Sequence, residues 1–345
     1  MTWQILDSNY EQAKIAVIGI GGGGGNAIQH MISSGIKGVE FICANTDSQA
    51  LSMIHNAKTI KLGNDLTKGL GAGNNPEVGK QATELSRLEI IDNLANTEML
   101  FIAAGMGGGT GTGGAPVIAK IAKELNILTV AVVTTPFKTE GQKRASQAKN
   151  GISSLIENVD SLIEVDNEKV FEIFPPETPI EKAFTKVNDV LMNAVKGVAN
   201  IVLKPSKINV DFADVLAVMS QKGMALMGYG SAEGENRAMA ATEMALNNPL
   251  IDEYSLQGAK GLLINITGGN DLTLFEVDQS VNKIRAEVDP EAELIFGAIK
   301  DENMTGKIRV SIVATALDGH KVENKTVLNM VSRIQNRNTG YSENL

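Results

Sequence analysis

The chain has 345 residues, of which 43% are hydrophobic, so it is long enough for two domains and can bury a substantial core. Its formal net charge of −9 argues against nucleic-acid binding, because an acidic surface repels a phosphate backbone. A single cysteine, Cys43, excludes an internal disulfide, and three scattered histidines offer no ligand spacing for zinc or another protein-bound metal.

The composition also bears on where the protein works. The first residues lack the basic and apolar regions of a signal peptide. No apolar run approaches the roughly 18 residues that a membrane-spanning helix needs. We therefore expect a soluble, cytoplasmic protein that does not insert into a membrane.

The first half of the chain alternates apolar strands with helices. Strands are predicted at residues 14–19, 39–45, 99–104, 128–134 and 160–165. Helices are predicted after the first and third of these strands, at residues 26–34 and 115–125. Continuous apolar strands separated by helices are typical of a parallel sheet covered on both faces. The expected fold class is therefore α/β, with a mostly parallel sheet and helices on both of its faces.

A long helix is predicted in the middle of the chain. It begins at residues 178–181 (TPIE), which combine a capping Thr, a Pro at the first helical position and a Glu at the third. The helical pattern continues to Leu203, and Pro205 ends it. This central helix is expected to join the two halves of the molecule.

Beyond the central helix, the predicted strands have fewer helices between them. Helices are predicted from residue 211, at 236–247 and at 274–286, and strands at 261–267, 293–299 and 307–315. This pattern indicates a second, smaller α+β domain. The predicted divisions are a first domain at 1–177, the central helix at 178–204, the second domain at 205–319 and a polar tail at 320–345.

A glycine-rich loop, residues 19–26 (GIGGGGGN), lies between the first strand and the first helix. In this arrangement backbone N–H groups and the start of the helix hold a phosphate, and glycine lets the anion approach the backbone. Gly19, Gly21 and Gly24 also satisfy the G-x-G-x-x-G pattern, with Asp47 where a ribose-binding acid would lie. The first loop by itself therefore leaves an NAD-dependent oxidoreductase as an open alternative.

A second glycine-rich loop, residues 105–114 (GMGGGTGTGG), again lies between a strand and a helix. Two such loops on neighbouring strands can surround one polyphosphate, with the hydroxyls of Thr110 and Thr112 as further donors. A dinucleotide fold has no use for the second loop, and neither loop matches the G-x-x-x-x-G-K-[ST] pattern of P-loop enzymes. The two loops together favour a nucleoside polyphosphate as the ligand.

The run GGGTGTG at residues 107–113 matches the signature of the tubulin/FtsZ family, and the chain resembles this family, in particular its bacterial cell-division branch. Further matching segments, in family order, are residues 45–47 (NTD), 68–73 (KGLGAG), 136–137 (PF), 140–141 (EG), Arg144 and 209–214 (NVDFAD). The resemblance extends from about residue 14 to residue 317. It implies a GTP-binding N-terminal domain, a central helix, and a C-terminal domain that activates the nucleotide of the neighbouring subunit.

The resemblance also implies which residues bind GTP or GDP, with Mg²⁺ accompanying the phosphates. The phosphates would be held by Gly21, Gly22, Gly23, Gly24, Gly25, Asn26, Gly107, Gly108, Gly109, Thr110, Gly111, Thr112 and Gly113. The remaining contacts would come from Asn45, from Gly71, Ala72 and Gly73 as γ-phosphate sensor, from Glu140 and Arg144 at the ribose, and from Asn167, Phe184 and Asp189 at the guanine. The residues by themselves allow structural alternatives: an i,i+4 ion pair for Glu140 and Arg144, and core packing for Phe184.

Asp211, Asp214 and Asn209 are the catalytic residues that the resemblance implies. They would enter the nucleotide site of the next subunit in a head-to-tail filament, where carboxylates can polarise the attacking water. By themselves, two aspartates three residues apart at a helix start are more often a helix cap. The expected function is a GTPase that is activated by its own polymerisation and forms the mid-cell division ring. A scaffold that assembles but hydrolyses slowly is the alternative.

The chain departs from the family pattern at three places. Thr139 replaces a frequent aromatic residue, and Asp166 and Glu168 replace the usual Pro and Asp around Asn167. Both changes flank expected nucleotide contacts. In addition, residues 337–345 do not resemble the apolar peptide with which bacterial members dock membrane tethers and regulators. The expected partner is therefore the chain itself, and binding to tethers and regulators is left open.

Overall fold

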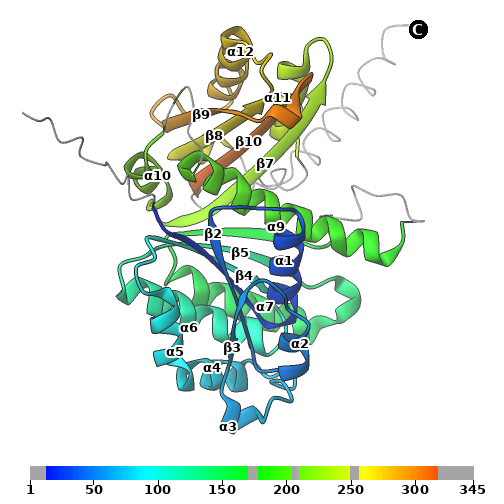
Figure 1. Ribbon diagram of the computed structural model, residues 1–345, viewed down its shortest axis with the longest axis vertical. Coiled ribbons are helices and arrows are strands. Elements are labelled where there is room, and N and C mark those ends of the chain that lie inside the picture. Colours follow the sequence, from blue (N-terminus) through cyan, green and yellow to red (C-terminus); the bar gives the residue numbers. More distant parts are fainter. Residues whose placement is uncertain (1–12, 170–177, 204–207, 209, 249–255, 318–345) are drawn as a thin grey trace, which may run out of the picture.

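The structure, a computed structural model, describes residues 13–169, 178–203, 208, 210–248 and 256–317 (Figure 1). These residues form one ten-stranded sheet with the order β3-β2-β1-β4-β5-β6-β7-β10-β8-β9. Helices cover both faces of the sheet, and α9 (Ile180–Leu203) runs across the middle of the molecule in Figure 1. The predicted α/β class with a central helix is confirmed.

The N-terminal strands pair in parallel throughout. They are β1 (Ile15–Ile20), β2 (Val39–Asn45), β3 (Lys58–Lys61), β4 (Met99–Gly105), β5 (Leu128–Thr135) and β6 (Ser161–Asp166). Five of these strands lie within a residue or two of their predicted bounds, because long apolar runs between helices are a strong signal. The sequence did not predict β3, a short edge strand in which Ile60 alone is buried.

The strand β7 (Gly223–Glu233) was also missed, although it joins the two halves of the sheet. It pairs in parallel with β6 and antiparallel with β10 (Lys307–Leu317). Its glycines weaken the strand signal, but a Cβ atom at Gly230 would lie 2.0 Å from the backbone oxygen of Ala241. The glycine is needed because a helix packs directly on this strand.

The C-terminal half completes the sheet with β8 (Gly261–Gly268) and β9 (Glu293–Lys300). The pairing of β10 with β7 and β8 is antiparallel, and β8 pairs with β9 in parallel. The predicted boundaries near 177 and 204 lie in or beside segments outside the described residues, so the division into domains stays a prediction. In the described part of the chain, no helix has the length and apolar character to span a membrane.

Three apolar layers hold the helices to the sheet. One face of the sheet is covered by α1 (Gly21–Ser33), α9 and α10 (Phe212–Met219). The other face of the N-terminal strands packs on α4 (Pro76–Leu85), α5 (Arg87–Leu94), α6 (Thr110–Glu124) and α7 (Gln142–Ile156). The other face of the C-terminal strands packs on α11 (Arg237–Leu246) and α12 (Leu274–Arg285). The short elements are α2 (Ser48–Ser52), α3 (Asn64–Thr67), η1 (Lys138–Glu140), η2 (Leu256–Gly258) and η3 (Glu302–Met304).

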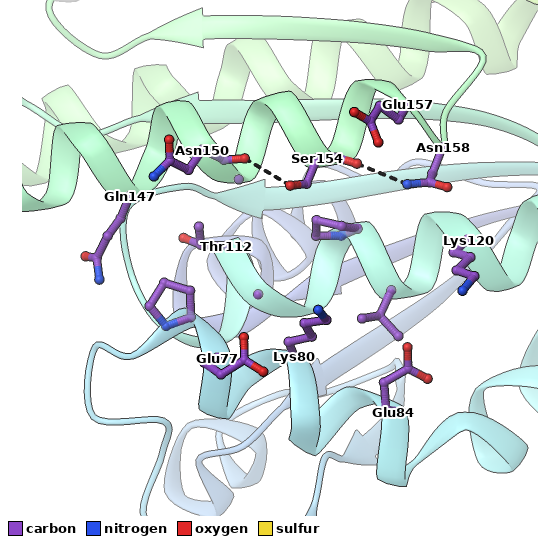
Figure 2. A pocket seen from close by; sticks show the side chains of 15 residues that line it. Glu77, Lys80, Glu84, Thr112, Lys120, Gln147, Asn150, Ser154, Glu157 and Asn158 are labelled. Carbon is purple, nitrogen blue, oxygen red and sulfur yellow. Dashed lines mark hydrogen bonds between the residues drawn. The ribbon is translucent and has the colours of Figure 1, made fainter.

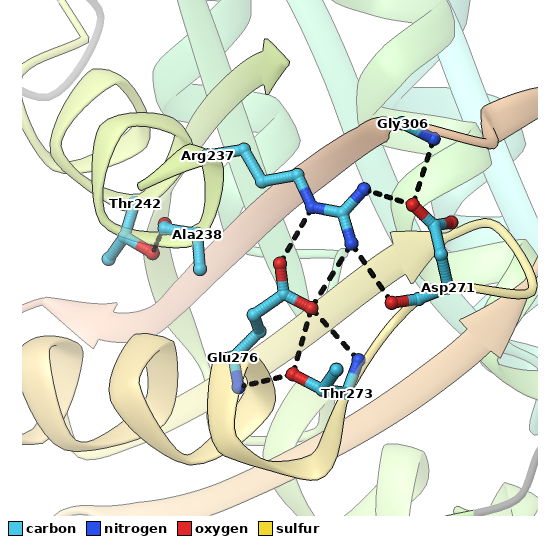
Figure 3. A network of polar contacts seen from close by, with 7 residues as sticks. All are labelled: Arg237, Ala238, Thr242, Asp271, Thr273, Glu276 and Gly306. Atoms are coloured by element: carbon cyan, nitrogen blue, oxygen red, sulfur yellow. Dashed lines mark hydrogen bonds and ion pairs between the residues drawn. The ribbon is translucent and has the colours of Figure 1, made fainter. Parts of the chain in front are cut away.

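A buried arginine ties together the loops at the outer end of the C-terminal half (Figure 3). Arg237 donates to Glu276 Oε1 at 2.6 Å and to Asp271 Oδ2 at 2.5 Å. The same Asp271 oxygen accepts from the backbone N–H of Gly306 at 3.0 Å, and Glu276 Oε2 accepts from that of Thr273 at 2.9 Å. The hydrogen bonds from Arg237 hold the pKa of both carboxyls below their ordinary values. This network, which we call the Arg237 network, is satisfied from within the chain.

Candidate functional site

A pocket of about 400 Å³ opens where the N-terminal parallel strands end. The carboxyl edge of a parallel sheet is the usual place for a ligand in an α/β fold. The predicted site residues that line this pocket are Gly21, Gly22, Gly23, Asn26, Gly108, Gly109, Thr110, Gly111, Glu140, Arg144, Asn167 and Phe184. The structure therefore brings both glycine loops, the expected ribose contacts and two of the expected base contacts to one place.

The two glycine loops touch each other at the floor of the pocket. Gly21 has φ +73°, and a Cβ atom there would lie 3.0 Å from the backbone nitrogen of Gly111. The hydroxyls of Thr46 and Thr110 lie 2.7 Å apart and link the segment after β2 to the start of α6. The loops thus form one continuous backbone surface.

The helices that begin at this floor, α1 and α6, are open at their N-termini. Neither helix has a side-chain hydrogen bond at its cap, and neither has an acidic residue in its first turn. The first backbone N–H groups of a helix have no partner within the helix, and the helix dipole adds partial positive charge there. The floor of the pocket is therefore suited to an anion such as a phosphate.

The opposite end of the pocket offers an aromatic ring and a buried amide. Phe184 is 49% exposed, so it does not serve core packing, and the edge of Phe137 contacts it with ring centroids 5.9 Å apart. Asn167 is 7% exposed, and its Oδ1 has no hydrogen-bond partner among the described residues. A buried acceptor without a partner is costly unless a ligand donates to it.

Glu140 and Arg144 form the ion pair that their spacing also allowed. The second carboxylate oxygen of Glu140 accepts from the backbone N–H of Phe137 at 3.0 Å. Both side chains still line the pocket. The ion pair and a role in ligand binding are therefore compatible.

Several predicted phosphate contacts have a packing role instead of lining the pocket. A Cβ atom at Gly24 would lie 2.4 Å from Ala103 O, and one at Gly113 would lie 1.9 Å from Pro76 O. The hydroxyl of Thr112 accepts from the backbone N–H of Gly107 at 2.8 Å and so shapes the second loop from behind. These positions let the backbones of neighbouring elements meet.

A second cavity, of about 260 Å³, shares Gly21, Gly22 and Asn26 with the pocket and is also lined by Gly25, Cys43 and Asn45. Asn45 Oδ1 accepts from the backbone N–H of Asp47 at 3.2 Å. The carboxylate of Asp47 caps α2, so it is already used within the chain. Burial raises the pKa of the Cys43 thiol to about 12, which leaves it unreactive.

The expected γ-phosphate sensor lies beside the second loop without lining the pocket. The backbone N–H of Gly71 donates to Thr46 O at 3.2 Å. A Cβ atom at Gly109 would lie 2.8 Å from the Cβ of Ala72. Gly71 and Gly73 both have positive φ, which permits the sharp course of this segment.

Asp189 lies on α9 between residues that line the pocket, but it does not line the pocket itself. Its Oδ1 is 2.8 Å from His30 Nε2, and its Oδ2 is 3.2 Å from Lys186 Nζ. His30 follows Asn26, which does line the pocket, by one turn of α1. The sequence analysis gave no role to His30, because its partner is 159 residues away.

Asp211 and Asp214 are exposed and cap α10. The Asp211 side chain accepts from the Asp214 backbone N–H at 2.9 Å, and the Asp214 side chain accepts from the Asp211 backbone N–H at 3.1 Å. No residue of α10 lines the pocket of its own chain. Asn209, the third expected catalytic residue, lies outside the described residues.

Some lining residues were not among the individual contacts predicted, although Gly105 and Met106 belong to the second glycine-rich loop. They are Gly105, Met106, Thr134, Thr135, Pro136, Val187, Asn188 and Leu191. Thr134 and Thr135 are the last residues of β5 and Pro136 follows them, so the rule that ligands bind at the carboxyl edge was the available signal. Val187 and Leu191 are four apart on α9 and share a helix face.

A separate polar groove of about 450 Å³ runs between α4, α6 and α7 (Figure 2). Lys80 and Lys120 line it together with Glu77 and Glu84. Charges of both signs give it no preference for one ligand class. Thr112 forms part of its floor, so the groove lies behind the second loop. No group of three or more metal-ligating side chains occurs in the part of the chain that the structure describes.

Comparison with known proteins agrees with this geometry. Residues 14–175 match the family described as "Tubulin/FtsZ family, GTPase domain", and residues 223–318 match "FtsZ family, C-terminal domain". The chain belongs to the tubulin/FtsZ family. Within this family, it is 44% identical to the solved structure "FtsZ dimer, empty (M. jannaschii)", with a TM-score of 0.85 over 90% of each chain.

Curated members of the tubulin/FtsZ family are similar over most of this chain. It is 53% identical to the "Cell division protein FtsZ" of Bartonella bacilliformis over 88% of the chain and 52% of that relative. It is 51% identical to the protein of the same name from Pseudomonas putida, over 93% of the chain and 80% of that relative. The chain thus spans about half the length of the first relative and most of the second.

Proposed function

We propose that the chain binds GTP and GDP in the 400 Å³ pocket and hydrolyses GTP when copies of it assemble head to tail. One observation carries this proposal. A floor of open helix starts faces a buried amide oxygen without a partner, across a pocket with an exposed aromatic ring. Such a pocket matches a nucleotide, which has an anion at one end and a flat polar base at the other.

The base end favours guanine over adenine. The Watson–Crick edge of guanine carries two donors, N1–H and the 2-amino group, whereas adenine carries an acceptor at N1. Asn167 Oδ1 can accept from guanine, and Phe184 can stack on the ring. Asn26, in the second turn of α1, also lines the pocket. Adenine in the same orientation would place its N1 acceptor against the Asn167 oxygen and carries no 2-amino group, since its own donor, the 6-amino group, lies where guanine has O6.

The dinucleotide alternative loses its support. Asp47, the candidate ribose-binding acid, caps α2 with its carboxylate accepting from two backbone N–H groups. The second glycine loop, which a dinucleotide fold does not need, forms half of the pocket floor. The membership of the tubulin/FtsZ family points in the same direction.

Among the residues that the structure describes, the pocket itself offers no free carboxylate that could polarise an attacking water. Glu140 is the acidic residue among those that line it, and both of its oxygens are engaged, by Arg144 and by the Phe137 N–H. Asp211 and Asp214 are exposed on α10, outside their own pocket. We infer that they enter the pocket of a neighbouring copy and polarise the attacking water there, with Asn209 beside them. Mg²⁺ would accompany the triphosphate and neutralise its charge.

Assembly and a role in division are parts of the same proposal. Relatives at 51% to 53% identity are named cell division proteins, and a solved relative is titled a dimer. We propose that the chain polymerises into the filaments of a division ring at mid-cell. A site completed by a second copy explains why polymerisation and hydrolysis would be linked.

The first experiment measures phosphate release from GTP over a range of protein concentrations, with light scattering recorded alongside. A rate per molecule that is near zero below a threshold and rises with scattering is the expected result. A constant rate without scattering would mean a self-contained GTPase and would overturn the shared site. Scattering on addition of GTP without phosphate release would favour the slowly hydrolysing scaffold.

A further inference from the structure

The wall of the pocket at its base end is built from two segments that follow neighbouring strands. Residues 135–140 begin with the last residue of β5, and residues 166–168 begin with the last residue of β6. Thr135 pairs with Asp166 at the last register position of the two strands. Asn167, with its unpartnered oxygen, is the middle residue of the second segment. The position of Asn167 therefore depends on how the two segments are joined.

Asp166 joins them at the strand ends. Its Oδ1 accepts from the Thr135 hydroxyl at 3.2 Å and from the backbone N–H of Glu168 at 2.9 Å. The second bond closes a tight turn around Asn167, in the manner of an Asx turn. One carboxylate oxygen thus holds both the turn and the neighbouring strand end.

Glu168, two residues after Asp166, makes a second link between the two segments. Its Oε1 accepts from the backbone N–H of Lys138 at 2.7 Å, and its Oε2 lies 3.5 Å from Lys138 Nζ. The Glu168 side chain is 24% exposed, whereas that of Lys138 is 85% exposed. The bond to the backbone is therefore the stronger link, since an exposed ion pair contributes little.

The segment that Glu168 holds also supports the aromatic platform. Phe137 precedes Lys138, and its ring meets that of Phe184 edge to face, at an interplanar angle of 86°. The backbone N–H of Phe137 is held by Glu140. Moving Lys138 away from Glu168 would therefore move the support of Phe184 and displace Asn167 at the same time.

We propose that Asp166 and Glu168 form a latch that sets base selectivity, by positioning the Asn167 amide and, through residues 135–140, the Phe184 ring. The proposal rests on the proposed nucleotide site. Neither latch residue lines the pocket, so both are positioning residues. Among the described residues, the hydrogen bonds of the latch reach Thr135 and Lys138 and not the glycine loops that would hold the phosphates. Loosening it should therefore reduce preference for guanine more than attraction for the diphosphate.

The test is competition of unlabelled GDP and ADP against a fluorescent GDP analogue, in the full chain. For Glu168→Ala we expect GDP affinity to fall about tenfold and ADP affinity only about threefold, because both bases lose stacking on Phe184 but only guanine also loses the bond to the Asn167 oxygen. Thr135→Val, which removes one donor to Asp166 and keeps the shape, should lower the GDP-to-ADP ratio about threefold. Thr135→Val also tests the latch if Glu168→Ala does not fold.

Two matched variants separate the latch from general destabilisation. Glu168→Gln keeps an oxygen that can accept from the Lys138 N–H, and Lys138→Met removes only the exposed ion pair. Both should keep the GDP-to-ADP ratio within about twofold of the unmodified protein. Equal losses of GDP and ADP affinity in Glu168→Ala, or an unchanged ratio in both Glu168→Ala and Thr135→Val, would overturn the latch alone. An unmodified protein that does not prefer GDP would overturn the proposed function, and the latch with it.

Discussion

The two helices that start at the pocket floor, α1 and α6, differ from two helices of the C-terminal half, α10 and α12. At α1 and α6, no side chain caps the first turn and no acidic residue lies in it. At α10 and α12, a full capping box closes the helix start, from Asp211 with Asp214 and from Thr273 with Glu276. Arg237 donates to both carboxylate oxygens of Glu276, so this capping carboxylate is paired within its own chain (Figure 3). A helix start left open by its own chain is available to a ligand.

Carboxylates have different uses in the Arg237 network and at α10. In the Arg237 network the carboxylates compensate a buried cation and hold loops together. At α10 the carboxylates of Asp211 and Asp214 cap the helix start, and both side chains are exposed. An exposed cap can serve its own helix and still meet a neighbouring copy. The following predictions test whether the open and closed helix starts differ in function as they do in structure.

The largest effect is expected at α10. Asp214→Ala should bind GTP but lose about a thousandfold in phosphate release, since a positioned acid or base contributes up to several orders of magnitude. Asp214→Asn keeps an oxygen for the Asp211 N–H, so its melting temperature should match the unmodified protein while its turnover is still lost. Mixing either variant with the unmodified protein should lower phosphate release by more than the dilution alone explains. Normal turnover by Asp214→Asn would reduce Asp214 to a helix cap.

The second prediction compares two glycines of the open region. A Cβ atom at Gly113 would meet the backbone of α4, whereas one at Gly22 meets nothing within 4 Å. Gly113→Ala should lower the free energy of unfolding by about 3 kcal/mol, measured by chemical denaturation. Gly22→Ala should leave it unchanged yet weaken GDP binding about tenfold, because the methyl group enters the pocket. Equal stability of the two variants would contradict this division.

The third prediction concerns the Arg237 network. Arg237→Met keeps most of the side-chain volume but leaves Asp271 and Glu276 without their cation. We expect the free energy of unfolding to fall by about 2 kcal/mol, since hydrogen bonds to charged groups are lost in a part-buried site. GDP affinity should be unchanged because no residue of this network lines the pocket. A parallel loss of GDP binding would show that the two regions are coupled.

The fourth prediction concerns the base end of the pocket. Phe184→Ala should weaken GDP binding about tenfold through lost stacking, as seen in nucleotide affinity by competition. The melting temperature should barely change, because Phe184 is 49% exposed. Leu216, which is 41% exposed on α10, provides a matched control. Leu216→Ala should leave GDP binding as it is, and a loss there as large as in Phe184→Ala would point to general damage.

The smallest effect is the acid sensitivity of the closed region. The hydrogen bonds from Arg237 hold the pKa of Asp271 and Glu276 below their ordinary values. A lowered carboxyl pKa contributes stability that is fully present above the ordinary pKa and is lost as pH falls through the lowered one. Melting temperature should therefore fall more steeply from about pH 5 to about pH 3 in the unmodified protein than in Arg237→Met. Identical slopes would mean that the network does not titrate with unfolding.

The sequence analysis succeeded where the signal was local. Apolar runs between helices predicted five parallel strands, and the glycine loops after β1 and β4 predicted the pocket floor. It missed β7, whose glycines have a reason only in the packing of α11 on that strand. It also treated the glycines of each loop as equivalent phosphate contacts. The structure divides them into positions that line the pocket and positions, such as Gly24 and Gly113, where backbones meet.

Side-chain contacts between residues far apart in the chain could not be predicted from the sequence. His30 meets Asp189 across 159 residues, and Lys138 meets Glu168 across 30. Both pairs lie beside the pocket, and neither has a spacing that indicates contact. The resemblance to a family led to Asp189 and Asn167, but their surroundings required coordinates. The functions argued for Glu168 and Asp166 follow from those surroundings.

The sequence by itself determined the α/β class, the central helix and the two glycine-rich loops between strand and helix, because strand burial, helix caps and glycine turns are set by neighbours along the chain. The tertiary structure decided which residues line the pocket and which glycines serve packing. It also placed Asp211 and Asp214 outside the pocket of their own chain. These outcomes depend on how the sheet brings distant segments together. Contacts between residues far apart in the chain have no characteristic spacing in the sequence, so only the tertiary structure shows them.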